Sequence, residues 1–163
     1  MHPALQLLLC LILFMFLHIS VMAICARAFG ITLRQVSYGV GPTLLRLGTV
    51  HVKLLPLAGN VALKDTREET LYDDDPCRDA YNFQPLWKQV LLPLSGVAVL
   101  LVLSLGIMGA SGWERFIAAF GQIADGALAP LSRAQDLLGD GEQFARTHGF
   151  AQVFALFSLK LCA

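Results

Sequence analysis

Two long apolar runs dominate the pattern of hydrophobic and polar positions. Residues 4–26 contain no Asp, Glu, Lys or Arg, and residues 90–112 read VLLPLSGVAVLLVLSLGIMGASG. About 20 predominantly apolar residues are enough for a helix to cross a bilayer. Pro93 and the glycines of the second run are tolerated inside membrane helices. The pattern therefore predicts two full transmembrane helices.

The segment between these runs, residues 27–88, is mixed in character. Its stretch VHVKLLPLAGNVAL alternates and is rich in β-branched residues, which predicts short strands forming a small membrane-associated β-hairpin or sheet. GVGP at residues 39–42 and LAGN at residues 57–60 are turn signals. The stretch TREETLYDDDPCRD, which includes Asp73, Asp74 and Asp75, is polar and acidic and predicts a solvated loop.

The C-terminal third is less regular. Residues 113–148 are amphipathic, are interrupted by glycines and a proline, and predict short helices at the membrane interface. Residues 149–163, GFAQVFALFSLKLCA, are too short to span a bilayer and are expected to start a third transmembrane helix. The predicted fold is mainly α and integral to the membrane, with residues 1–163 forming a single membrane domain.

Composition supports the membrane class. The 163 residues are 56% hydrophobic and 15% charged, whereas ordinary soluble domains have about 25% charged residues. The chain has 12 Lys and Arg residues and 12 Asp and Glu residues. It therefore lacks the excess of basic residues that is typical of nucleic-acid-binding proteins. The four cysteines form no CxxC pair, which argues against a zinc ribbon or a disulfide scaffold. The first run is too long for a signal peptide and lacks a basic start, so we expect a retained helix.

The distribution of basic residues predicts the orientation. Residues 27–88 carry eight of the twelve Lys and Arg side chains, and residues 113–149 carry three. The positive-inside rule then places the 27–88 loop in the cytoplasm. We expect a multi-pass protein of a bacterial inner membrane, in contact with membrane lipid.

The first apolar run contains one titratable ring, that of His18. Ionisable groups inside a membrane are costly and are candidates for functional sites, although a histidine can also simply hydrogen-bond a neighbouring helix. Met15, His18, Met22 and Cys25 form one helical stripe, whose soft ligands suit Cu(I) or whose side chains serve only in packing.

Five stretches follow one another in the order and spacing of a known family: HISVMAICARAFG, YGVGP, LPLAGNVAL, FQPLWKQVLLPLSG and FALFSLKLCA. Together they resemble the site-2 protease family of intramembrane zinc metalloproteases. That family carries HExxH in its first span, then an Ala-Arg pair and a glycine, a Gly-x-Gly-Pro turn, and a Phe-x-x-x-x-Trp lead into a Leu-Ala-Gly-Pro helix.

The resemblance implies a hydrolytic centre that this chain does not complete. In HExxH two histidines four residues apart hold zinc, and the glutamate is the general base on zinc-bound water. Here the motif reads His18-Ile19-Ser20-Val21-Met22. Ile19 cannot transfer a proton, and the thioether of Met22 suits zinc poorly. No catalytic residue is therefore expected, His18 is the one candidate metal ligand, and zinc is expected only in an active enzyme.

The resemblance also suggests a place for a substrate. Gly59 and Asn60 match the family's edge strand, which is thought to hold an unwound substrate; the alternative is an ordinary turn.

Three functions fit these observations. The preferred hypothesis is a catalytically inactive homologue, a pseudoenzyme that binds or regulates transmembrane partners, whether a substrate helix or a partner protein. The second is an active intramembrane zinc metalloendopeptidase completed by a missing C-terminal part or a second chain. The third is a small membrane protein unrelated to proteases, which a plain helical hairpin without strands would favour.

Overall fold

The computed structural model describes residues 2–65, 77–126 and 143–162. The chain forms two compact units, one of residues 15–97 and one of residues 1–14 together with 98–163. The long helices α1 and α2 each begin in one unit and end in the other, and each unit is described by itself.

Two helices, α1 (Pro3–Ala28) and α2 (Leu86–Met108), are long and apolar enough to cross a membrane, as the sequence predicts. Only 17% of the most apolar window of α1 and 28% of that of α2 is buried by the protein. A core helix of a soluble protein buries most of its apolar surface. Most of the apolar surface of both helices is therefore not covered by the described part of the chain.

Both helices end at glycines in the left-handed conformation. After α1, Gly30 has φ +74°, and its N–H donates to the carbonyl of Arg27 at 3.1 Å. After α2, Gly109 has φ +62°, and α3 (Ala110–Gly126) follows directly. Glycine adopts this conformation without the Cβ clash of other residues. As a result α2 ends before Gly109, whereas the apolar pattern alone continues to residue 112.

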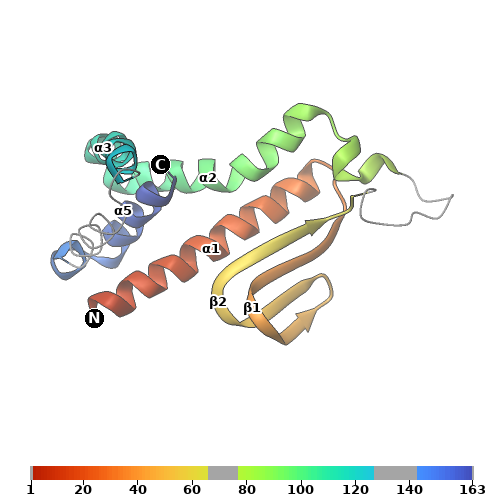
Figure 1. The fold of residues 1–163 in the computed structure, drawn as a ribbon, viewed down its shortest axis with the longest axis horizontal. Coiled ribbons are helices and arrows are strands. Elements are labelled where there is room, and N and C mark those ends of the chain that lie inside the picture. The colour runs from red at the N-terminus through yellow and green to blue at the C-terminus, as the bar shows by residue number, and fades with distance from the viewer. Residues whose placement is uncertain (1, 66–76, 127–142, 163) are drawn as a thin grey trace. The chain divides into compact units, whose positions relative to one another are not determined.

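Two long strands, β1 (Leu33–Leu47) and β2 (Val50–Leu63), follow α1 in the sequence and form an antiparallel sheet beside it (Figure 1). The middle of β1 has partners in both halves of β2. Tyr38, for example, is paired with Gly59 and also with Val52, and the N–H of Val36 donates to the carbonyl of Thr49 at 2.8 Å. Residues 50–52 of β2 therefore pair with residues 36–38 of β1 as well as with residues 45–47, so the two strands curl back on themselves.

The strands are longer than predicted, and the turn expected at residues 39–42 is wrong. These residues lie inside β1, where Gly39 and Gly41 have φ +100° and +92° and the register shifts. A positive φ in a strand is typical of a β-bulge, which bends the strand without ending it. Glycines that signal turns in sequence thus act here as bends.

A polar junction ties the base of the sheet to the segment before α2, within η1 (Cys77–Asp79) and η2 (Tyr81–Phe83). The ammonium of Lys64 lies 2.9 Å from the Asp79 carboxylate, which also accepts a hydrogen bond from the Thr32 hydroxyl at 2.6 Å. These two donors hold the pKa of Asp79 below its usual range, with the Thr32 bond first. Asp79 is therefore a structural group, not part of a solvated loop, whereas Asp73, Asp74 and Asp75 lie outside the described residues.

A second cation fastens the start of α2 to the end of α1. The ammonium of Lys88 donates to the carbonyl of Phe29 at 2.9 Å, and it lies 5.9 Å from the Phe29 ring and 5.7 Å from the Trp87 ring. Beside it, Ala26, Ile31 and Leu92 form a small buried apolar cluster. These contacts fix the ends of both helices around the base of the sheet.

The other unit contains α3, a helical stretch over residues 143–147, and α5 (Phe150–Cys162). The Arg115 guanidinium lies 5.1 Å from the Phe144 ring, and Phe14 meets Phe157 edge to face at 6.5 Å. Six residues of α5 are buried, so it is a packed helix of 13 residues. Its role as the start of a third transmembrane helix stays a prediction.

Candidate functional site

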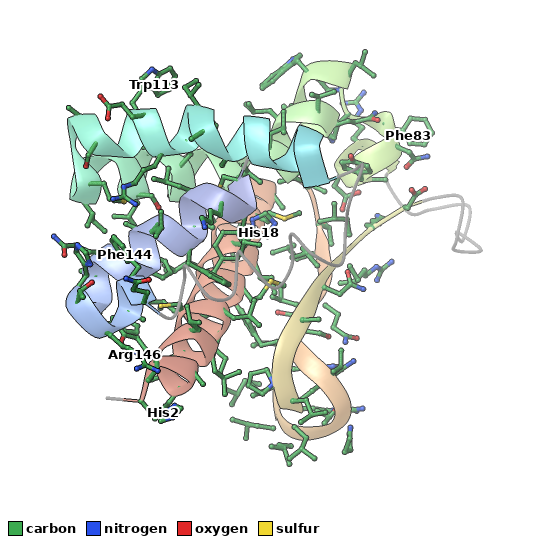
Figure 2. The ribbon with its side chains drawn as sticks, turned by 60° about the vertical axis from the view of Figure 1, so that its left-hand side comes forward. His2, His18, Phe83, Trp113, Phe144 and Arg146 are labelled. Atoms are coloured by element: carbon green, nitrogen blue, oxygen red, sulfur yellow. The ribbon has the colours of Figure 1, made fainter. Side chains whose placement is uncertain are left out.

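The candidate site lies in the middle of α1, where His18, Ile19 and Met22 occupy three of the positions that the resemblance singles out (Figure 2 labels His18). A predominantly apolar sequence with no glycine, and with no proline after Pro3, keeps this stretch helical up to Ala28. The site therefore lies on a regular helical scaffold, and its geometry depends on what packs against each side chain.

Ile19 is buried, with 3% of its surface exposed, and it packs against the sheet at Gly59. A Cβ placed on Gly59 would collide with Cδ1 of Ile19 and would lie 2.7 Å from the carbonyl oxygen of Ser37. The absence of a side chain at Gly59 thus makes the space that Ile19 fills. An aliphatic side chain with no ionisable atom occupies the place where the resemblance expects a general base.

His18 packs against Gly96 of α2 in the same way. A Cβ on Gly96 would collide with the His18 ring, lying 2.7 Å from Cε1, and would also approach the carbonyl oxygen of His18 to 2.9 Å. Glycine at this position lets α2 approach the imidazole closely. The ring is therefore enclosed by packing in the direction of α2.

The sheet is also attached to the side of α1 that carries Ile19 through Tyr38, a residue that sequence reasoning did not select. Its hydroxyl lies 2.9 Å from the hydroxyl of Ser20, and its ring lies 5.0 Å from that of Phe16. Because the Ser20 hydroxyl donates to the Phe16 carbonyl at 2.7 Å, Tyr38 is the donor of the pair. This contact joins distant parts of the chain, so no local pattern could reveal it.

Gly59 and Asn60 lie inside β2, opposite Tyr38 and Ser37 of β1. The ordinary turn considered for these two residues is therefore wrong. Asn60 is exposed, whereas Gly59 lies under Ile19. A role of the two residues in binding a substrate stays a prediction.

The described part of the chain brings no set of metal ligands to His18. Among the residues that the structure describes, no group of three or more His, Cys, Asp or Glu side chains could hold a metal ion. Met22 is half-buried, and His51 lies near the start of β2, opposite Ser37 and Arg46. Of the two positions in α1 that the resemblance assigns to zinc ligands, that of His18 carries a residue type that commonly binds zinc, and that of Met22 does not.

No protein-family model matches this chain, and no curated protein matches it.

Proposed function

We propose that this chain is a catalytically inactive, site-2-protease-like membrane protein that binds or regulates transmembrane partners. The observation that carries the proposal is Ile19, buried against Gly59 at the position of the general base. A hydrolytic metal site needs a group that takes a proton from the bound water. An isoleucine in a packed apolar contact supplies none.

The arrangement of elements supports this proposal over an unrelated membrane protein. A plain helical hairpin would place only a loop between α1 and α2, whereas here β1 and β2 pack against α1 at the level of His18. A sheet held beside the first apolar helix suits the capture of an extended segment by strand addition. The proposed partner is a transmembrane helix of a substrate-like or regulated protein.

Location supports the same proposal. Two largely unburied apolar helices suit a multi-pass protein, and the eight Lys and Arg side chains of residues 27–88 favour a cytoplasmic position of the sheet by the positive-inside rule. A bacterial inner membrane, where the positive-inside rule operates, is the proposed compartment.

Metal content tests the proposal directly. We expect the full chain, purified in detergent and loaded with zinc, to retain no stoichiometric metal by mass spectrometry after dialysis, and to leave a membrane-helix peptide uncleaved. His18→Ala is the matched control and should have the same metal content. Stoichiometric zinc that is lost in His18→Ala, or zinc-dependent cleavage by this chain alone, would overturn the proposal.

A further inference from the structure

A pocket of about 450 Å³ is formed by α3, the helical stretch of residues 143–147 and α5. It lies within the unit of residues 1–14 and 98–163, whereas the candidate site lies within residues 15–97. Sites for small molecules typically measure about 300–1,000 Å³, so this pocket is large enough to hold one. We call it the basic pocket, because Arg115 of α3 and Lys160 of α5 both line it.

The charge of the basic pocket has one sign. No Asp or Glu is among the described residues that line it, whereas Arg115 and Lys160 supply two cations from two different helices. Lys160 is half-buried, and it is the one charged residue of α5. Charges of one sign between low-dielectric walls raise the local concentration of the opposite charge. The pocket therefore favours an anionic ligand.

The Arg115 side chain is positioned by an aromatic ring. Its guanidinium lies 5.1 Å from the ring of Phe144, and that ring is stacked on the His148 ring with centroids 3.7 Å apart (Figure 2 labels Phe144). A guanidinium that rests on a ring keeps its N–H donors in its own plane, from which two of them can bind a phosphate together. A phosphate is therefore a suitable anion for this pocket.

The uncharged part of the lining suits an apolar group beside the anion. The pocket is also lined by Leu156, which is 8% exposed, by Ala118 and by the Phe144 ring. Gln143 adds a neutral amide to the lining. A bare phosphate ion would leave the apolar surface and most of the volume unused. An ester of phosphate with an apolar group would contact both parts of the lining.

We propose that the basic pocket binds a phosphate ester that carries an apolar group, with Arg115 and Lys160 on the phosphate oxygens and Leu156 against the apolar group. An anionic phospholipid has this chemistry, and so has a soluble alkyl phosphate. The inference goes beyond the function proposed above, because it assigns a ligand site to the other unit and depends on neither a metal nor a protein partner.

The test titrates the full chain, purified in a neutral detergent, with phosphatidylglycerol, and native mass spectrometry counts the lipid molecules bound. We expect one tight, saturable site. Arg115→Gln and Lys160→Gln should each weaken binding about tenfold or more, because a hydrogen bond to a charged group is worth at least that factor. Arg146→Gln is the matched control: this exposed arginine follows the same helical stretch but does not line the basic pocket, so binding should be unchanged.

A second variant keeps the test valid should Lys160→Gln fold poorly. Gln143 is exposed, so Gln143→Glu is expected to fold normally. It places a carboxylate in the lining and should also weaken binding about tenfold, because the new charge repels the phosphate. The melting temperature without lipid should be the same for this variant and the parent chain.

Competition distinguishes the two sources of the phosphate ester. Hexyl phosphate that displaces the bound phosphatidylglycerol would identify a soluble ester as a sufficient ligand. Phosphatidylglycerol that stays bound at saturating hexyl phosphate would identify the phospholipid as the ligand. Phosphatidylcholine, which has no net charge, should bind more weakly than phosphatidylglycerol in either case.

Three results would overturn the inference. The first is the absence of saturable binding of both phosphatidylglycerol and hexyl phosphate. The second is equal weakening by Arg146→Gln and Arg115→Gln, which would indicate attraction to basic residues in general. The third is equal binding of phosphatidylcholine and phosphatidylglycerol, which would mean that the acyl chains alone are held. Zinc content tests the proposed function separately, so the failure of either proposal is recognised independently of the other.

Discussion

At the scale of single residues, two glycines decide what surrounds the candidate site. Gly59 and Gly96 leave room for Ile19 and His18, and each would bring a Cβ into collision with its partner. The sequence predicts His18 as a candidate ligand and Ile19 as a lost base, because both follow from a local motif. It does not predict the glycine contacts, because these join residues that are 40 and 78 positions apart in the chain.

Replacing Gly59 tests the packing of Ile19. Gly59→Ala should lower the free energy of unfolding by about 1–3 kcal/mol, because the added methyl group overpacks the site. Adding Ile19→Val should recover only part of the loss, since the contact with the Ser37 carbonyl oxygen at 2.7 Å remains. Thermal unfolding in detergent measures both.

Gly121→Ala is the matched control for this substitution. A Cβ at this position in α3 meets nothing within 4 Å, so stability should stay equal or rise slightly. Equal stability of Gly59→Ala and the parent chain would contradict the close packing of Ile19.

At the scale of elements, the helices followed from the apolar runs, but the strands followed only in part. The alternation of residues 50–63 predicts β2. The full length of β1 is not predicted, because its glycines are of the kind that indicates turns. Whether a glycine ends a strand or bends it depends on the partner strand, and that pairing is long-range. The Lys64–Asp79 pair at the base of the sheet is not predicted from the sequence either, because it also depends on how separate segments pack together.

The junction at Asp79 should make the sheet sensitive to acid. Its carboxylate has a lowered pKa because Thr32 and Lys64 donate to it. The folded state therefore gains stability that is complete above the usual aspartate pKa and is lost as the pH falls through the lowered pKa. The melting temperature of the chain in detergent, measured from neutral to strongly acidic pH, should fall in that window.

Asp79→Asn should remove this part of the pH dependence. At neutral pH it should also cost about 1–2 kcal/mol, because the buried Lys64 loses its charged acceptor while the partial exposure of Asp79 limits the effect. Asn82→Asp, which adds an acid nearby, should leave the acid transition in place. An unchanged acid transition in Asp79→Asn would show that Asp79 does not control it.

At the scale of the whole molecule, the proposed topology places the two ends of α2 on opposite sides of the membrane. Hydropathy predicts that α1 and α2 exist, because composition and length are local properties. The side of the membrane that each loop occupies is predicted by comparing the numbers of Lys and Arg residues in the different loops. This prediction therefore depends on the whole chain and not on one segment.

Cysteine labelling tests that topology. In a background with the four native cysteines replaced by serine, Phe83→Cys should react with an impermeant maleimide only after a bacterial inner membrane is opened. Trp113→Cys, at the other end of α2, should react in intact spheroplasts. Both parent side chains are more than half exposed, at 61% and 55%, so the protein itself does not shield either position from the reagent. The reverse pattern would place the sheet outside the cell.

The space above Gly59 also bears on how this chain could change during evolution. Cδ1 of Ile19 and the carbonyl oxygen of Ser37 both lie close to the same point. A carboxylate in place of the isoleucine would lie close to the lone pairs of that carbonyl oxygen, so the single change Ile19→Glu would be destabilising. Introducing a proton-transferring group at this position would therefore demand paired changes, one on α1 and one on the sheet, and such coupling makes the present packing hard to change by single mutations.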